Sequence, residues 1–333
     1  MEIVLTGIKP TGTPHIGNYV GAIKPAVAAS TNPNVHSFFF LADYHAIGGD
    51  ADAVARSTLE IAASWLAVGL DPNKVVFYRQ SDVPEIPELT WILHTVAAKG
   101  LMNRAHAYKA AVQENEATPG RDPDQGIMMN LYSYPILMAA DILMFKAAKV
   151  PVGKDQKQHV EMARDMAQRF NHNFGETFVL PDAVIGENVA TLPGLDGRKM
   201  SKSYANVIPL FAEEKPLRKL IMKIKTNSLE PGQPKDPSDS ALYDIYRAFA
   251  SEAECAAVRE RYAAGIGWGE MKQVLFERIN AEIAPARAEY ERLMAAPAEV
   301  EKLLLQGAET ARAVSRPFLA EIRERVGIRG LAR

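Results

Sequence analysis

The N-terminal part of the chain alternates between short apolar runs and helix-forming stretches, and this rhythm constrains the fold more than any other feature. Apolar runs at residues 2–6, 37–41 and 74–78 are short enough for strands, and the middle run is apolar at nearly every position. Strands that are buried on both faces are typical of a parallel sheet covered by helices. Helical patterns at residues 17–29 and 53–68 separate these runs. The sequence therefore predicts an α/β fold with a Rossmann-like parallel sheet.

Beyond this region the pattern becomes mostly helical. Residues 88–169 favour helices, with a polar loop at 113–125 that is rich in Pro, Gly and charge. Short strands are predicted at 150–152 and 187–192. After residue 206 the helix formers Ala, Glu, Arg and Leu dominate, apart from a loop at 230–240 that contains three prolines.

Length and charge bound the class of protein. A chain of 333 residues is long enough for two domains, and we expect an α/β domain at residues 1–205 and a helical domain at 206–333. The net charge of −2 excludes a globally basic nucleic-acid-binding protein, so a nucleic acid would have to meet a local patch. Residues 312–333 hold six arginines and two glutamates and could form such a patch, although a solvated helix face has the same composition.

Cysteine content and hydropathy indicate the compartment. The single cysteine, Cys255, excludes an intrachain disulfide framework and any cysteine-rich zinc or iron–sulfur site. The chain enters an apolar strand without a secretory leader, and no stretch approaches the roughly 18 apolar residues of a membrane-spanning helix. We therefore expect a cytoplasmic protein with no membrane partner and no structural metal.

The turn after the first predicted strand has the composition of a phosphate-binding turn. Pro14-His15-Ile16-Gly17-Asn18 joins a strand to a helix, and a helix N-terminus offers free N–H groups to phosphate oxygens. Gly17 would admit a nucleotide close to the backbone, and His15 and Asn18 can donate hydrogen bonds. Gly12 and Gly17 have the spacing of a Walker loop, but Asn18 and Tyr19 replace its Lys and Ser/Thr. An ordinary βα turn is the alternative interpretation.

Two further segments favour the same chemistry. Lys199-Met200-Ser201-Lys202-Ser203 carries two mobile cations suited to a leaving pyrophosphate, unless it is simply an exposed surface loop. Gly153-Lys154-Asp155-Gln156 follows a predicted strand and opens a helix. Asp155 could bind ribose hydroxyls or orient magnesium, and it could equally be the N-cap of the next helix.

A carboxylate in an apolar helix suggests a pocket for a flat ligand. Tyr134, Met138 and Asp141 are spaced i, i+4 and i+7 and share one helix face. An apolar wall with one acceptor suits an aromatic ring that bears a single N–H. Such a stripe is more often core packing, but a buried carboxylate without a partner is rare and weakens that alternative.

These segments together resemble the bacterial tryptophanyl-tRNA synthetases, a family of class I aminoacyl-tRNA synthetases. The resemblance rests on the two signatures at 14–18 and 199–203, and on the blocks at 43–47, 134–143 and 150–159, in the expected order. It implies that ATP and L-tryptophan form tryptophanyl-adenylate with release of pyrophosphate, and that the tryptophanyl group passes to the 3′ end of its tRNA. Mg²⁺ is expected to enter with the ATP phosphates, and DNA is not an expected partner.

The resemblance also implies an organisation for the chain. Residues 1–205 would be the catalytic domain, with a helical insertion at about 104–181 that forms the dimer interface of a homodimer. Residues 206–333 would meet the anticodon, and their arginine-rich end suits phosphate contacts.

The resemblance assigns the site residues in three overlapping sets. The catalytic residues would be His15, Asn18, Lys199 and Lys202. The ATP-binding residues would be Lys9, Pro10, Thr11, Gly12, Gly17, Asn18, Gly153, Lys154, Asp155, Val189, Lys199, Met200, Ser201, Lys202 and Ser203. The tryptophan-binding residues would be Leu5, His45, Tyr134, Met138, Asp141, Val150, Val152 and Gln156, although His45 by itself is more typical of a structural histidine.

Three other functions fit parts of this pattern. A tyrosyl-tRNA synthetase could use Asp141 for a phenol hydroxyl, and pyrophosphate exchange with each amino acid distinguishes the two. A tRNA-binding paralogue without catalysis is disfavoured by the presence of Gly17, Asn18, Lys199 and Lys202. A nucleotidyltransferase that acts without tRNA would not need the helical C-terminal region.

Overall fold

A five-stranded parallel sheet forms the centre of the computed structural model, which describes residues 2–185 and 191–331. The strand order is β3-β2-β1-β4-β5, so the order runs outward from β1 in both directions. This is the predicted Rossmann-like arrangement, and in such sheets a ligand-binding crevice opens where the strand order reverses, beside β1 and β4. The strands are β1 (Glu2–Ile8), β2 (Val35–Leu41), β3 (Val76–Arg79), β4 (Lys149–Pro151) and β5 (Asp182–Val184).

Alternate residues of the central strands enter two different apolar cores. On β2, Phe38 and Phe40 belong to the core beneath α4 (Glu85–Leu93), α7 (Met129–Met144) and α8 (Lys157–Phe174). Phe39 and Leu41 belong to the core formed with α3 (Ala51–Ala67) and the C-terminal helices. Successive side chains of a strand point to opposite faces of the sheet. Since both faces are covered, residues 37–41 have no solvent-facing position, which explains their continuous apolar run.

The helices of the first part follow the predicted pattern closely. Where residues 17–29 predicted one helix, α1 (Ile16–Asn18), a π-helical turn (Tyr19–Ile23) and α2 (Lys24–Ala29) form one helical stretch. The helix predicted at 53–68 is α3 (Ala51–Ala67). The remaining helices are α4 (Glu85–Leu93), α5 (Lys99–Met102), α6 (His106–Glu116), α7 (Met129–Met144) and α8 (Lys157–Phe174), so the polar loop begins after residue 116 rather than at 113.

The fifth strand of the sheet was not predicted: the sheet ends with β5 at Asp182–Val184. A strand was expected at 187–192, of which only residues 191 and 192 are described, and neither belongs to a strand. Residues 186–190 lie outside the described residues, as does the predicted ATP-binding residue Val189. β5 escaped prediction because it is a short edge strand whose Asp182 and Val184 are exposed, so it lacks the apolar run of a buried strand.

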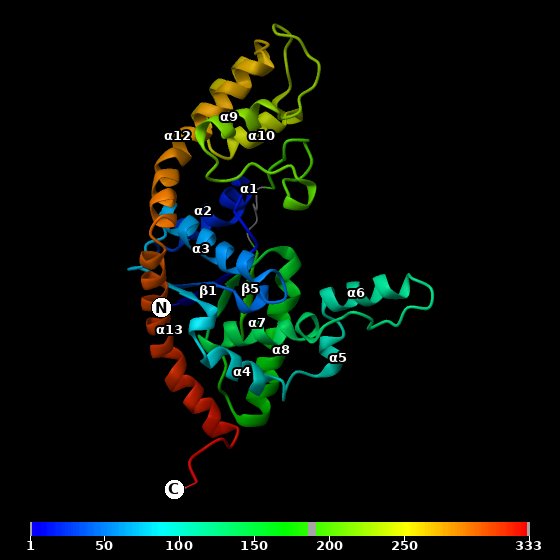
Figure 1. Ribbon diagram of the computed structural model, residues 1–333, viewed down its shortest axis with the longest axis vertical. Helices are drawn as coiled ribbons and strands as arrows, with labels where there is room; N and C mark the ends of the chain where they lie inside the picture. Colours follow the sequence, from blue (N-terminus) through cyan, green and yellow to red (C-terminus); the bar gives the residue numbers. More distant parts are fainter. Residues whose placement is uncertain (1, 186–190, 332–333) are drawn as a thin grey trace.

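The C-terminal part is helical, as predicted. Figure 1 shows α12 and α13 following one another along one side of the molecule, while α6 projects from the opposite side. Within the described ranges, every helix is too short or too polar to traverse a lipid bilayer. The helices are α9 (Glu214–Met222), α10 (Ala241–Arg247), α11 (Glu252–Ala263), α12 (Trp268–Met294) and α13 (Pro297–Arg325).

The last helix returns to the sheet and packs along its edge strand. α13 contacts β3, with Leu304 in one core and Ala308 in the other, so the helix passes from one face of the sheet to the opposite face. Between them, Gly307 lies against β3 so closely that an added Cβ would overlap the carbonyl oxygen of Phe77. Glycine is therefore required at this crossing, and α13 covers an edge that would otherwise be open to solvent.

The arginine-rich end takes part in this docking. Arg312 Nη2 lies 3.1 Å from Glu85 Oε1, and Arg323 pairs with Glu88. Arg316 also faces Glu85, at 3.6 Å, and Arg325 pairs with Glu321 within the helix. Three arginines of this end therefore face acidic partners on α4, more than two hundred residues away in sequence, and contact of this end with phosphates stays a prediction.

Candidate functional site

The turn after β1 is closed by two of the predicted catalytic residues. His15 is the N-cap of α1, and its Nδ1 accepts a hydrogen bond from the main-chain N–H of Asn18 at 3.2 Å. Asn18 Oδ1 accepts from the N–H of His15 at 3.1 Å. This reciprocal capping box uses one atom of each side chain. Among the described residues, His15 Nε2 and Asn18 Nδ2 have no hydrogen-bond partner, so both can donate to an oxygen-rich ligand.

The His15 ring is neutral at physiological pH. Its residue is only 8% exposed, and burial, followed by the charge of Lys202, lowers its pKa to about 4. Since Nδ1 accepts a hydrogen bond, the proton of the neutral ring lies on Nε2. His15 therefore presents an uncharged N–H donor rather than a cation.

The loop that carries the second signature lies directly against this turn. The N–H of Leu210 donates to the carbonyl oxygen of Pro14 at 2.9 Å. Lys202 Nζ donates to the carbonyl oxygen of Thr11 at 2.6 Å, and burial lowers the pKa of this lysine. Two segments separated by almost two hundred residues are thus brought together, as the sequence predicted.

Gly17 allows the two signatures to pack closely. A Cβ at this position would lie 2.9 Å from His15 Nδ1, closer than real Cβ contacts, and 3.6 Å from Met200 Sδ. Met200 is 4% exposed and belongs to the core beside α1. The methionine of the second signature therefore anchors the loop, while its lysines remain exposed.

The other predicted ATP-binding residues differ in exposure. Lys9, Thr11, Gly153, Lys154, Lys199 and Ser203 are exposed, Gly12 and Ser201 are partly buried, and Pro10 is buried. The alternative that Asp155 is a helix N-cap was wrong: it lies inside the 3₁₀ turn Lys154–Gln156, and its Oδ2 accepts from Gln156 Nε2 at 3.1 Å. A Cβ at Gly153 would lie 2.6 Å from Asp155 Oδ1, so glycine is needed for this carboxylate to fold back over the turn.

Asp141 of α7 is a buried carboxylate with two donors. It is 1% exposed, and it accepts hydrogen bonds from His45 Nε2 at 3.0 Å and from Gln80 Nε2 at 2.7 Å. Burial raises its pKa, although both hydrogen bonds oppose this shift. The hydroxyl of Tyr78 is buried and has no partner among the described residues. Each carboxylate oxygen can accept more than one hydrogen bond, so Asp141 retains capacity for a third donor.

Apolar side chains predicted for the pocket share one core with the helix that carries Asp141. Leu5 of β1 and Val150 of β4 are buried in the same core as the apolar face of α7, and Met138 and Val152 pack against that core. Leu5 and Val150 come from the two strands between which the strand order reverses. The stripe on α7 therefore contributes to core packing, and its role as the wall of a ligand site stays a prediction.

Tyr134 and Gln156 are joined by a histidine that the sequence did not single out. The Tyr134 hydroxyl donates to His159 Nε2 at 2.6 Å, and His159 Nδ1 donates to Gln156 Oε1 at 2.9 Å. Burial lowers the pKa of His159, which favours the neutral ring that this pair of contacts requires. The ring of Tyr134 also packs edge-on against His45, with centroids 6.3 Å apart. Together with the bond from His45 to Asp141, these contacts link the polar members of the predicted tryptophan-binding set into one network.

Two buried amides near these residues were also missed. Gln80 is fully buried and follows β3, so its position at the carboxyl end of a predicted strand was a usable signal. Asn206 is 2% exposed and binds the main chain of the second signature. It follows the signature by only three residues, but nothing in the sequence separates it from an ordinary loop asparagine.

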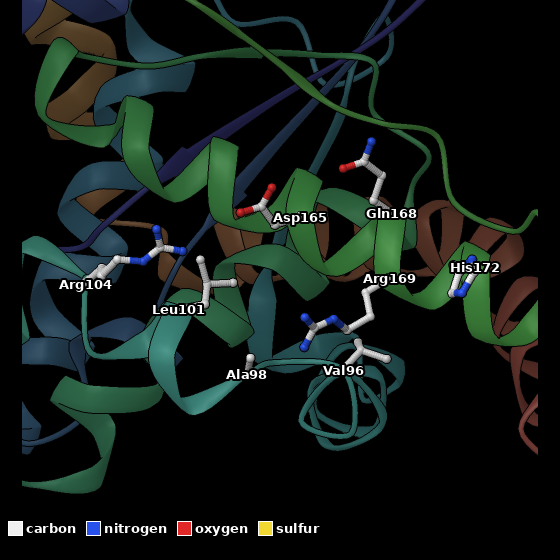
Figure 2. A pocket seen from close by; sticks show the side chains of 8 residues that line it. All are labelled: Val96, Ala98, Leu101, Arg104, Asp165, Gln168, Arg169 and His172. Carbon is white, nitrogen blue, oxygen red and sulfur yellow. The ribbon is translucent and has the colours of Figure 1, made fainter.

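A hollow of about 500 Å³ lies apart from all these residues. Figure 2 shows the side chains of Arg104 and Arg169 beside it, with Leu101 and Val96 on its apolar side. None of the predicted site residues lines it. Over the described residues, no group of three or more His, Cys, Asp or Glu side chains is arranged to hold a metal ion.

Known proteins resemble this chain over most of its length. A family described as class I tRNA synthetases (W and Y) matches residues 2–283. The tryptophan–tRNA ligase of Pseudomonas aeruginosa is 60% identical over 333 residues, covering 98% of this chain and 74% of that protein. The corresponding ligase of Neisseria meningitidis is 56% identical and covers 98% of both chains. The crystal structure of tryptophanyl-tRNA synthetase from Campylobacter jejuni complexed with ADP and tryptophan is 43% identical, with a TM-score of 0.88 over 98% of this chain and 99% of that one.

Proposed function

The chain belongs to the class I tRNA synthetases for tryptophan and tyrosine, and from this membership we infer that it is a tryptophan–tRNA ligase. It activates L-tryptophan with ATP to tryptophanyl-adenylate and pyrophosphate, and it transfers the tryptophanyl group to the 3′ end of tryptophan tRNA with release of AMP. The observation that carries the choice of amino acid is the buried carboxylate of Asp141, held in an apolar surrounding between His45 and Gln80.

At the nucleotide end, His15 and the two lysines bind the phosphates of ATP. Adenylate formation breaks the bond between the α- and β-phosphates, and negative charge grows on the leaving pyrophosphate. Lys199 and Lys202 neutralise that charge, and the N–H of His15 donates to a phosphate oxygen without adding a formal charge. Lys202 already contacts the loop before the first signature through the carbonyl oxygen of Thr11, so ATP exchanges a carbonyl oxygen for a phosphate oxygen at this ammonium.

Mg²⁺ enters with ATP as part of the substrate. The ion prefers phosphate and carboxylate oxygens and rarely needs a dedicated protein cage. Asp155 is an exposed carboxylate on the turn after β4, and it fits a single protein oxygen ligand or a partner for ribose hydroxyls. The neighbouring Gly153 and Lys154 complete this side of the nucleotide site.

At the amino-acid end, Asp141 accepts the indole N–H of tryptophan. Met138, Leu5, Val150 and Val152 cover the rings, and the Tyr134–His159–Gln156 network orients the polar side of the pocket. A buried acceptor left without a donor is costly, so the site rejects rings that lack an N–H.

The remaining parts of the chain serve tRNA binding and assembly. Residues 206–333 act as the anticodon-binding domain. Its helices α9 to α11 offer the contact surface, since α12 packs on α3 and α13 packs on β3 of the catalytic domain. The helical insertion at about 104–181 forms a homodimer interface. Met128 and Met129, at the start of α7, support this assignment because they are 67% and 70% exposed in the single chain. A cytoplasmic location agrees with the single, free cysteine.

ATP–pyrophosphate exchange with each of the twenty amino acids tests the function. Tryptophan should support exchange and tyrosine should not. Asp141→Ala should lower kcat/KM for tryptophan about 10- to 100-fold, which corresponds to a hydrogen bond to a charged group worth about 1.5–3 kcal/mol. For a tryptophan analogue with sulfur in place of the indole N–H, Asp141→Ala should lower kcat/KM only a little. The control Glu161→Ala, on the exposed face of α8, should leave kcat/KM for both substrates unchanged.

Two outcomes would contradict these assignments. Exchange that prefers tyrosine, or no exchange with any amino acid, would exclude the tryptophan–tRNA ligase. Equal losses for tryptophan and its sulfur analogue in Asp141→Ala would exclude the acceptor role alone. The assembly is tested separately by sedimentation: the wild-type chain should sediment as a dimer, and Met129→Lys should shift it to the monomer.

A further inference from the structure

The side chain of Asn206 is the centre of the loop that carries the two lysines. Its Oδ1 accepts the main-chain N–H of Ser201 at 2.8 Å. Its Nδ2 donates to the carbonyl oxygen of Lys199 at 3.1 Å and to Asp196 Oδ1 at 2.7 Å. All the hydrogen atoms of this amide are used, and the residue is 2% exposed. The contacts are not those of a solvated loop residue.

The orientation of this amide follows from its neighbours. Asp196 also accepts a hydrogen bond from the main-chain N–H of Arg198 and pairs with the Arg198 guanidinium at 2.6 Å. The hydrogen bond from Asn206 is the largest of the causes that lower the pKa of Asp196 to about 2. An ionised carboxylate only accepts, so the NH₂ group of Asn206 must face Asp196 and its oxygen must face Ser201. Aspartate at position 206 could not make the same contacts, since it would set two carboxylates side by side.

The amide holds the main chain on both sides of Met200. The bonds to Lys199 and Ser201 fix the peptide groups before and after this methionine, whose side chain is buried beside Gly17. Because the direction of each lysine depends on this stretch of backbone, one side chain sets how both leave the loop. Lys202 then reaches Thr11, three residues before the first signature.

The space around Asn206 is filled by main chain. A Cβ added at Gly194 would overlap the Asn206 amide, and the N–H of Leu195 donates to the Asn206 carbonyl oxygen at 2.9 Å. Ala205, just before it, has a φ of +50°, a left-handed conformation that a side chain adopts only where surrounding contacts hold it. The hairpin at 192–200 and the lysine loop are therefore clamped together at this residue.

We propose that Asn206 is a positioning residue for the ATP-dependent step, which orients Lys199 and Lys202 toward the phosphates by fixing the backbone between them. This role rests on the proposed function of the lysine loop. Asn206 does not touch the amino-acid pocket, whose residues come from β1, β4 and α7. Its loss should thus affect the nucleotide and leave tryptophan binding intact.

Asn206→Ala, compared with Asn171→Ala, tests this role. Asn171 is a matched control because its buried amide also bonds main chain, donating to the Phe178 carbonyl at 2.8 Å and accepting from the Phe178 N–H at 2.9 Å, on α8. Both variants should lose a similar amount of thermal stability. At a temperature where both variants are folded, Asn206→Ala should lower kcat for tryptophan-dependent exchange about 100-fold and raise KM for ATP. A loss of this size is expected when the lysine ammonium groups are displaced by about 1 Å from the phosphates. Asn171→Ala should keep the wild-type values.

The readouts separate positioning from stability. The tryptophan dissociation constant, measured by equilibrium dialysis without ATP, should be unchanged in Asn206→Ala. A wild-type kcat and KM for ATP in a folded Asn206→Ala would overturn the proposal, as would an equal activity loss in both variants. Should Asn206→Ala not fold, Asn206→Ser carries the same comparison. Failure of the proposed function is distinct, because the wild-type chain itself would then show no tryptophan-dependent exchange.

Discussion

Replacing Gly307 by alanine has two opposite effects on the free energy of unfolding, one through helix propensity and one through packing. The structure shows which of the two is larger. Gly307 lies within α13, and alanine in a helix interior is favoured over glycine by about 1 kcal/mol. On helix propensity alone, Gly307→Ala would be stabilising. At this position, however, the new Cβ would overlap the main-chain carbonyl of Phe77 on β3.

The size of the packing effect follows from what the Cβ meets. Overpacking of a filled core costs about 1–3 kcal/mol, and the upper end applies where the obstacle is backbone rather than a flexible side chain. After the gain in helix propensity, about 2 kcal/mol of destabilisation remains. In a chain of this size that corresponds to a melting temperature lower by about 3 °C. Hydrogen exchange should also be faster in α13, because the helix must move away from the sheet.

A second glycine supplies the control. Gly269 lies in α12 and has no atom within 4 Å of its would-be Cβ, so Gly269→Ala should be neutral or stabilising by about 0.5 kcal/mol. Calorimetry on the wild type and both variants measures the difference. If Gly307→Ala were as stable as Gly269→Ala, the close approach of α13 to β3 would be refuted, and with it the account of how the sheet edge is covered.

The other predictions concern the turn after β1 and the ion pairs of α13. The pKa of His15 is about 4 in the folded chain and 6.5 in a free imidazole, so the unfolded state binds the extra proton and stability falls as pH drops from 6.5 toward 4. His15→Asn keeps a cap acceptor and should flatten this part of the pH profile of unfolding free energy; an unchanged slope would contradict the neutral ring. Glu85→Gln should lower stability by about 2 kcal/mol, since it breaks a largely buried pair with Arg312. The exposed partner Glu321→Gln should change it by less than about 0.5 kcal/mol, and urea titrations that show equal effects would argue against the docking role. Gly17→Ala should reduce pyrophosphate exchange at least about 10-fold by displacing the His15 ring, whereas full activity would show that the capping box tolerates a shift.

The parts of the site that could be predicted are those where local chemistry and position agree. A hydrogen-bond donor at His15 and cations at Lys199 and Lys202 follow from residue type, and the helical spacing placed Asp141 on the same face as Met138. That His15 is neutral depends on its burial, which the sequence does not show. Even so, the donors of Asp141 were not predictable. Gln80 reaches it only because β3 and α7 pack in the same core, which is a property of the sheet order rather than of any local pattern.

The missed features depend on long-range docking or on weak patterns. The arginines of α13 have an ordinary basic composition, and nothing local indicates that Glu85 and Glu88 neutralise them. β5 is short and polar at an edge, so no apolar run marks it. His159 reads as one more polar residue of an amphipathic helix, until Tyr134 and Gln156 are brought to either side of its ring.

The closure of β3 by α13 has a consequence for synthesis on the ribosome. β3 ends at residue 79, but the helix that covers its outer edge consists of residues 297–325, which emerge more than two hundred residues later. Until then the nascent Rossmann sheet carries an unprotected border, which is the kind of surface that chaperones bind and that seeds aggregation. Truncation before residue 297 should therefore yield insoluble chains rather than a free-standing catalytic half.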